Sequence, residues 1–181
     1  GTSDVLKKTA VNFVPLTPIS FLLRTAEVYP NRIAIIYGER RVTWKALLDR
    51  SRRIASALAA VGVGVGDTVA VVAANTPEML ELHFGVPMCG AVLNTLNVRL
   101  DPATLSFMLQ HGEAKVLITD TEYADVVGSA LDLLKEKPIV IDIVDPSFVG
   151  GHRLGRSDFE QFLAGGDPTW QGYKIEDEWQ S

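Results

Sequence analysis

Cys89 and His83 are the first side chains of this sequence that could do chemistry. They lie in LHFGVPMCGAVLNTLNV, residues 82–98, which has no Asp, Glu, Lys or Arg and holds the only cysteine and one of the three histidines. A reactive thiol needs a base or cation beside it, and none lies within four residues of Cys89. We therefore predict a small buried residue there. His83 shares a helix face with Met79 and Pro87, which favours a core or pocket-edge histidine over a catalytic base.

Asn94 and Asn97 could contact a ligand. Their side-chain amides fall at and just past the C-terminal end of a predicted strand, where open parallel sheets bind ligands. The alternative is a turn, because Asn readily hydrogen-bonds its own turn backbone. The sequence favours the turn, and it leaves His83, Asn94 and Asn97 as the only candidate substrate-binding residues.

The glycine-rich run AVGVGVGD, residues 60–67, invites comparison with a phosphate-binding loop. The dinucleotide motif needs a strand before its glycines and a helix after them. Here a predicted helix precedes and a strand follows, and Asp67 stands in place of the third glycine. Gly62 suits the C-terminal cap of that helix. We therefore predict an ordinary helix-to-strand turn and no cofactor-binding residue in this segment.

Other residues that could do chemistry have no supporting pattern. Neither G-x-x-x-x-G-K-[ST] nor G-x-S-x-G occurs. The histidines lack the spacing of a zinc site, so no metal is predicted. Three carboxylates could act as acid or base, but we expect solvated loop charges at Asp142, Asp145 and Asp158. Three aromatic residues fit ordinary packing, namely Trp44, Phe84 and Phe107. No catalytic residue is predicted.

Composition limits the class of protein. The chain has 181 residues, of which 47% are apolar and 22% charged, as in a single globular domain. A net charge of -5 without a dense Lys/Arg block argues against nucleic acid as a partner. Residues 82–98 fall short of the roughly 20 apolar residues that cross a bilayer, so no membrane span is predicted. One cysteine allows no internal disulfide, and we expect a cytoplasmic, metal-free protein.

The elements that must position these residues begin with a helix that Thr17 caps. A hairpin follows, with strands at residues 33–37 and 41–43. Residues 44–61 then form an amphipathic helix. One face of that helix is predicted to be buried, with Leu47, Ile54, Ala55 and Leu58. Its arginines are predicted to point towards solvent, namely Arg50, Arg52 and Arg53.

From residue 68 strands and helices alternate. Strands are predicted at residues 68–74, 91–96, 115–120 and 138–145. The helices between them are one that Thr76 caps and that is kinked or ended at Pro87, one between Asp101 and Gly112, and one at residues 121–135. This alternation specifies the fold class as α/β: a parallel βαβ sheet flanked by helices, with a short N-terminal hairpin.

The chain divides into three parts in this interpretation. Residues 1–16 form an N-terminal extension, and residues 17–145 form the α/β subdomain. Residues 146–181 form a Gly/Pro-rich connecting segment with one short helix at residues 157–164.

Four stretches together carry a family resemblance: VTWKAL (residues 42–47), VGVGDTVAVVAANTPEML, VPMCGAVLNTLNVRL and AKVLITD. They resemble the N-terminal portion of the AMP-forming acyl-CoA synthetases, the adenylate-forming superfamily. VTWKAL departs from the usual first core motif, since Lys45 and Ala46 stand where many members have a residue followed by Glu. Residues 81–100 look most like the short- to medium-chain group, which includes plant acyl-activating enzymes.

This resemblance implies the N-terminal subdomain of the adenylate-forming fold. The parent enzyme would join a short- to medium-chain fatty acid, or another carboxylic acid, to ATP and then transfer the acyl group to CoA. Its cofactors would be ATP, Mg and CoA. The family's phosphate loop, T-S-G-T-T-G-x-P-K, would begin beyond Ser181, and its catalytic residues match no position here. We therefore expect an N-terminal piece of such an enzyme that is inactive alone and binds none of these cofactors well.

Some alternatives stay open. The face that the absent region normally covers is expected to be exposed and able to associate. The parent could instead be an aryl CoA ligase of the coumarate or benzoate type, and the chain could be a non-enzymatic α/β binding or assembly module. A plant origin would make the peroxisome an alternative to the cytoplasm.

Overall fold

The computed structural model describes residues 17–172. The predicted extension, residues 1–16, and residues 173–181 lie outside the described part. The helices are α2 (Pro18–Val28), α3 (Trp44–Ala60), α4 (Pro77–Met88), α5 (Pro102–His111), α6 (Ala124–Asp132) and α7 (Phe159–Ala164), with a 3-10 turn, η1, at Thr121–Tyr123. The strands are β1 (Ile33–Tyr37), β2 (Arg40–Thr43), β3 (Thr68–Val72), β4 (Val92–Thr95), β5 (Ala114–Asp120), β6 (Ile139–Ile143) and β7 (Ser157–Asp158).

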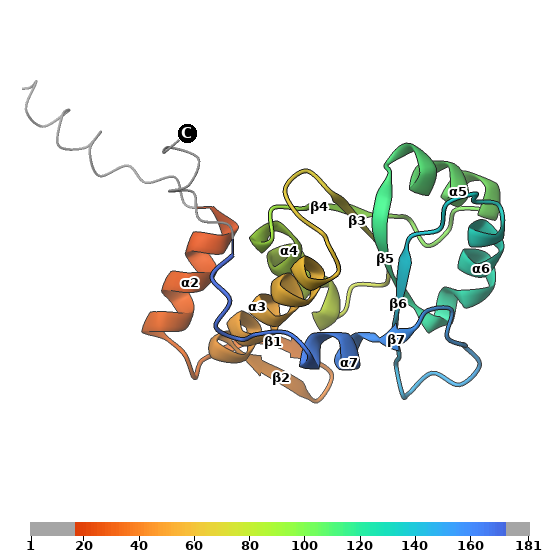
Figure 1. Cartoon of the computed structure of the whole chain (residues 1–181). Helices are drawn as coiled ribbons and strands as arrows, with labels where there is room; N and C mark the ends of the chain where they lie inside the picture. The colour runs from red at the N-terminus through yellow and green to blue at the C-terminus, as the bar shows by residue number, and fades with distance from the viewer. Residues whose placement is uncertain (1–16, 173–181) are drawn as a thin grey trace, which may run out of the picture.

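The central sheet confirms the predicted fold class. It has five strands in the order β4-β3-β5-β6-β7, and every neighbouring pair is parallel (Figure 1). Four of these strands are the predicted ones. The fifth, β7, is not foreseen, because a strand of two residues carries no periodic pattern. The predicted helix at residues 157–164 therefore begins only at Phe159.

The two faces of the sheet pack against different helices. Along β3, Val69 and Val71 belong to the larger buried cluster, which includes side chains of α3, α4 and α7. Ala70 and Val72 belong to the smaller cluster, which includes side chains of α5 and α6. Figure 1 shows α3 and α4 on one side of the sheet and α5 and α6 on the other. A strand covered on both faces must be apolar throughout, which is the pattern that predicted it.

The N-terminal elements match their signals. The Thr17 hydroxyl accepts a hydrogen bond from the Ser20 amide, and together they form a capping box at the start of α2. β1 and β2 form the predicted antiparallel hairpin. The Thr43 side chain caps α3, which the sequence does not foresee. At the other end of α3, Gly62 adopts a φ of 91°, as a C-terminal glycine cap does.

The first part of residues 82–98 forms a buried corner of the larger cluster, with Leu82, Val86, Met88, Cys89 and Ala91. α4 continues through Pro87 and ends at Met88, one residue later than a break at the proline would give. Gly90 then turns the chain with a φ of 83°, and a Cβ there would lie 2.7 Å from Cγ2 of Val65. A glycine is needed at this turn for both reasons. The edge strand β4 follows, and Val92 on it is 56% exposed, so the missing charges mark burial in the larger cluster only as far as Ala91.

Arg50 corrects the prediction that the α3 arginines point towards solvent. Its Nε and Nη2 donate to Glu81 of α4 at 2.7 and 3.0 Å, and its Nη1 and Nη2 donate to Glu160 of α7 at 3.0 and 2.7 Å. Glu81 is fully buried. The periodicity places Arg50 beside the buried stripe, and its two partners lie 31 and 110 residues away in the sequence, so the pattern of α3 alone could not reveal them.

The aromatic residues follow the packing prediction only in part. Trp44 and Phe84 pack against the larger cluster. Phe107 does not, since it is 65% exposed on α5 and stacks on His111 with the ring centroids 5.5 Å apart. The prediction was wrong for Phe107 because its position lies on the outer face of α5, whereas Leu105 and Leu109 face the sheet.

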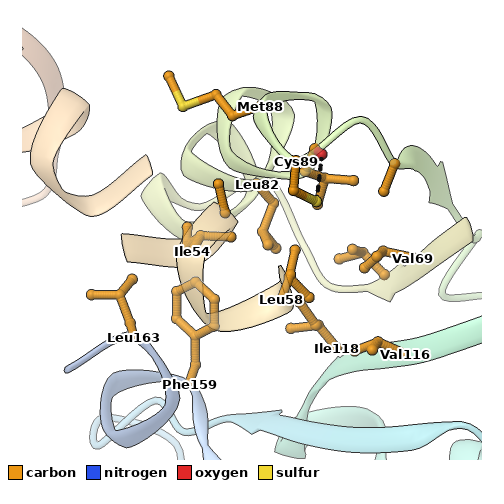
Figure 2. Packing of buried hydrophobic residues seen from close by; sticks show 14 of the residues in the cluster. Ile54, Leu58, Val69, Leu82, Met88, Cys89, Val116, Ile118, Phe159 and Leu163 are labelled. Atoms are coloured by element: carbon orange, nitrogen blue, oxygen red, sulfur yellow. Dashed lines mark hydrogen bonds between the residues drawn. The ribbon is translucent and has the colours of Figure 1, made fainter. Parts of the chain in front are cut away.

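The segment after β6 is part of the folded core. Phe159 and Leu163 of α7 are buried in the larger cluster, and Figure 2 shows them beside Ile54 of α3. β7 pairs with β6 at Ile141 and Asp142. The division of the chain at residue 145 stays a prediction, but part of the segment beyond it packs into the same core.

Between residues 17 and 172, no helix combines the length and the apolar character that crossing a bilayer requires.

Candidate functional site

An apolar groove lies between the start of α2, strand β1 and the N-terminal half of α4. Its volume is about 570 Å³, within the range that ligand sites occupy. The groove is lined by Pro18, Ile35, Ile36, Tyr37, Asn75, Thr76, Pro77, Met79, Leu80, His83 and Phe84. These residues come from three elements that are far apart in the sequence, so only the fold brings them together.

His83 lines this groove, in agreement with a pocket-edge position. Its Nδ1 lies 2.8 Å from the carbonyl oxygen of Met79, one helical turn earlier. Since a carbonyl oxygen only accepts, Nδ1 must carry a proton. A ligand could therefore donate a hydrogen bond to the ring only at Nε2. Whether His83 binds a substrate stays a prediction.

Thr76 occupies the predicted N-cap position of α4, but its side chain does not cap the helix. Its hydroxyl oxygen is buried and has no hydrogen-bond partner among the described residues. Buried hydroxyls are almost always paired, so this atom marks a place where a further group would be stabilised. Glu78 in the first turn of α4 is paired with Arg40 of β2 at 2.9 Å.

Asn94 and Asn97 lie away from this groove. Asn97 forms a turn, since its Oδ1 accepts a hydrogen bond from the Arg99 amide at 2.9 Å. Asn94 pairs with Ala70 in the sheet register, on the face that α5 covers, and its Nδ2 would lie 3.5 Å from a Cβ placed on Gly112. The structure therefore does not bring the three candidates together, and a ligand role for the asparagines stays a prediction.

The glycine-rich run is a helix-to-strand turn, as predicted, between α3 and β3. Its polar groups are already engaged. Gly64 donates its amide to the Asp67 carboxylate at 2.8 Å, and Lys115 donates to the Gly62 carbonyl at 2.6 Å and to Asp67 at 3.3 Å. An ATP triphosphate needs free amides and cations around it, and this loop does not provide them.

Cys89 is a buried packing residue, as predicted. Its Sγ donates to the Val86 carbonyl oxygen at 3.2 Å, the bond drawn in Figure 2. Burial raises the pKa of the thiol above its usual value, and the hydrogen bond from the Ala91 backbone only partly offsets this. Such a thiol is a poor nucleophile.

We expect iodoacetamide to alkylate Cys89 roughly 100-fold more slowly in the native chain than in the unfolded chain, because reaction requires local opening. Mass spectrometry of samples quenched over time measures both rates. Adding urea should accelerate labelling in parallel with unfolding. A native rate close to the unfolded rate would place the thiol at the surface and contradict this assignment.

The three candidate carboxylates have structural roles. Asp142 is fully buried, so its description as a solvated charge was wrong, and it accepts hydrogen bonds from the amides of Leu154 and Gly155 at 3.0 and 2.8 Å. Asp158 caps α7, and exposed Asp145 accepts from Ser147. Among residues 17–172 no three His, Cys, Asp or Glu side chains gather closely enough to hold a metal ion.

Sequence reasoning missed the ion cluster of Arg50, Glu81 and Glu160. Burial raises the pKa of Glu81 above its ordinary value, and the hydrogen bonds from Arg50 oppose that shift. Burial lowers the pKa of Arg50, but the hydrogen bonds with Glu160 and Glu81 outweigh it and the net shift is upward. One signal was available: beyond Glu78 in its first turn, α4 has Glu81 as its only acid, among mostly apolar residues. A buried position with one charge requires a counterion.

The sequence matches the model of the AMP-binding enzyme family over residues 22–162. The peroxisomal acetate/butyrate–CoA ligase AAE7 of Arabidopsis thaliana is 43% identical over 98% of this chain and 33% of that protein. The acetate–CoA ligase CCL3 of Humulus lupulus is 40% identical over 98% of this chain and 34% of that protein. The peroxisomal trans-cinnamate:CoA ligase of Petunia hybrida is 39% identical over 97% of this chain and 34% of that protein. The chain thus spans about a third of the length of these curated relatives.

Two solved structures share the fold. The anthranilate CoA ligase AuaEII, bound to anthranoyl-AMP, superposes with a TM-score of 0.77 at 22% identity, over 86% of this chain and 29% of that one. A benzoate CoA ligase from Burkholderia xenovorans LB400 superposes with a TM-score of 0.75 at 24% identity, over 87% of this chain and 30% of that one. At these identities the likeness establishes the fold alone, and it agrees with the α/β architecture described above.

Proposed function

Because this chain belongs to the AMP-binding enzyme family, we propose that it forms the N-terminal portion of an ATP-dependent, AMP-forming acyl-CoA ligase. The observation that carries the proposal is the family match across residues 22–162, together with relatives named as CoA ligases that align with 97–98% of the chain. The parent would convert a carboxylic acid, ATP and CoA into acyl-CoA, AMP and pyrophosphate.

Within that parent, this chain would act as a scaffold. In its glycine-rich turn the Gly64 amide is bound to Asp67, and Lys115 of β5 is bound to Gly62 and Asp67, so the turn does not suit a triphosphate. The positioned amides and cations that stabilise charge during adenylation would have to come from other parts of the enzyme. ATP, Mg and CoA are accordingly cofactors of the parent in this proposal, and not ligands that this chain binds well.

The substrate we propose is a short- to medium-chain fatty acid. Support comes from the names of two relatives, an acetate/butyrate–CoA ligase and an acetate–CoA ligase, at 43% and 40% identity. An aromatic acid is the second candidate, since a trans-cinnamate:CoA ligase is 39% identical and a benzoate–CoA ligase of Arabidopsis thaliana is also 39% identical. The non-enzymatic alternative has no such support.

For the compartment, we propose the cytoplasm or, for a plant parent, the peroxisome. Two of the three relatives described above carry a peroxisomal location in their names.

Pyrophosphate release in the presence of ATP, Mg and a carboxylic acid tests this proposal. We expect no acid-dependent release from the 181-residue chain, because the glycine-rich turn, the candidate phosphate loop among residues 17–172, does not suit a triphosphate. A version extended to the full length of the relatives should release pyrophosphate with acetate, butyrate or hexanoate faster than with benzoate or trans-cinnamate. The same protein without acid is the control.

Three results would count against parts of this account. Robust release by the 181-residue chain would contradict the scaffold role. A preference for the aromatic acids would favour the second candidate. An extended protein that folds and is inert with every acid would overturn the ligase proposal.

A further inference from the structure

We propose that residues 10–16, AVNFVPL, bind in the apolar groove between α2, β1 and α4. The segment immediately precedes Thr17 and lies outside the described residues. This inference concerns the chain's own N-terminal arm, and it does not depend on the ligase proposal.

The groove leaves large apolar side chains exposed to solvent. Three of its residues are large and solvent-exposed: Ile36 at 63%, Tyr37 at 47% and Leu80 at 39%. Contiguous apolar surface of this kind usually marks a contact with another segment or protein. Something apolar is therefore expected to cover it.

The chain's own N-terminal segment is the occupant best placed to do so. Pro18, the first residue of α2, is itself a lining residue of the groove. Phe13 is five residues before Pro18, and an extended chain covers up to about 17 Å over that distance. A segment tethered this closely has an effective concentration in roughly the millimolar range. Apolar contacts with an intrinsic Kd below about 1 mM would then keep it bound most of the time.

The composition of the segment matches that of the groove. Residues 10–16 have no charged side chain and offer Val11, Phe13, Val14 and Leu16, whereas Lys7 and Lys8 precede them. Among the described residues that line the groove none is Lys or Arg, and the nearby Glu78 is paired with Arg40. A carboxylic acid would therefore find no Lys or Arg among those lining residues, and Arg40 is already engaged, so an uncharged peptide segment suits this groove better.

The shape of the groove suits an extended peptide. Three consecutive residues of β1 line it, Ile35, Ile36 and Tyr37. Because neighbouring side chains of a strand point to opposite faces, a groove that touches all three runs along the edge of the strand. β2 occupies the other edge. An extended segment can add to such a free edge through its backbone, with alternate side chains filling the groove.

The Thr76 hydroxyl provides a polar contact for this segment. It is buried at the groove and has no partner among the described residues. A backbone amide or carbonyl of residues 10–16, or the side-chain amide of Asn12, could pair with it. That pairing would account for a buried polar atom that otherwise costs free energy.

Methyl NMR spectra of the 181-residue chain test the proposal, with isoleucine Cδ1 and methionine Cε labelled. Phe13→Asp should shift the methyl signals of Ile35, Ile36 and Met79 and leave Ile139, on β6, unchanged. It should also raise the fluorescence of a bound apolar dye several-fold, because the groove becomes uncovered. Leu6→Asp, the same kind of change outside the proposed segment, is the matched control and should do neither.

Several outcomes would overturn the proposal. Groove signals that do not respond to Phe13→Asp would mean that the segment is not bound there. Signals of the unmodified chain that shift on dilution would indicate a second copy as the occupant. Groove signals that move equally on addition of hexanoate to the unmodified chain and to Phe13→Asp would indicate an open ligand site.

Discussion

Replacing Arg50 by methionine is expected to lower the free energy of unfolding by about 3–5 kcal/mol, the usual result of removing one partner from a buried ion pair. The Arg50 side chain is 22% exposed, and its guanidinium bonds both carboxylate oxygens of Glu81, whose side chain is 0% exposed. Without Arg50 the Glu81 carboxylate would stay buried without a counterion. Since Arg50 also holds Glu160, the same change loosens α7 from α3.

The pH dependence of this defect has a definite sign. Burial raises the pKa of Glu81 in the native chain, and removal of Arg50 removes the hydrogen bonds that oppose that rise. A group whose folded pKa lies above its unfolded pKa favours folding as it takes up a proton. The deficit of Arg50→Met should therefore shrink as the pH falls from about 7 towards 5.

Urea unfolding followed by circular dichroism measures these effects, with two matched variants. Glu160→Gln should lose no more than about 1 kcal/mol, because Glu160 is 64% exposed and screened by solvent. Arg50→Met combined with Glu81→Met should recover most of the loss, because no unpaired charge remains. A double variant as unstable as the single one would mean that packing, and not charge, determines the effect.

The second large effect is expected at Phe159. Phe159→Ala should cost about 3–5 kcal/mol, as truncation of a buried aromatic residue does. The ring is 1% exposed and lies in the larger cluster, where Figure 2 shows it beside Ile54. The change also truncates the side chain of the first residue of α7, which anchors that helix in the cluster, so β7 and α7 should lose protection from hydrogen exchange before β3 does.

Two further variants make this test specific. Phe159→Leu keeps most of the apolar volume and should cost no more than about 1.5 kcal/mol. Leu133→Ala truncates a side chain that is 61% exposed. It should change the free energy of unfolding of the 181-residue chain by no more than about 0.5 kcal/mol. If Phe159→Ala lost less than Leu133→Ala, α7 would not belong to the core in solution.

Local signals predicted most of the fold. Thr17 and Asp101 at the starts of helices and Gly62 at the end of α3 specify backbone hydrogen bonds within one turn, so short sequence patterns are enough. The predicted helix ends were less accurate where no capping residue marked them. The predicted helix at residues 121–135 begins as the turn η1, and α6 ends at Asp132.

The candidate site could be predicted only in part. From the helix period the sequence predicted a core or pocket-edge position for His83, and the structure places it at the groove. It predicted a buried Cys89 because no base or cation lies nearby in the sequence. It could not place Thr76, Ile36 and Pro18 around one groove, since these belong to different elements. It also misjudged Asp142, because an acid near a strand end is usually solvated unless the fold supplies amides, as residues 154 and 155 do here.

The sequence by itself determined the alternation of strands and helices, the parallel sheet and the family resemblance, because period, caps and motifs are properties of neighbouring residues. Only the tertiary structure decided which charges are buried together and where apolar surface remains uncovered. Arg50, Glu81 and Glu160 meet from three helices. The groove is formed by the start of α2, strand β1 and α4. Both depend on how these elements pack, a geometry that no single stretch of sequence contains.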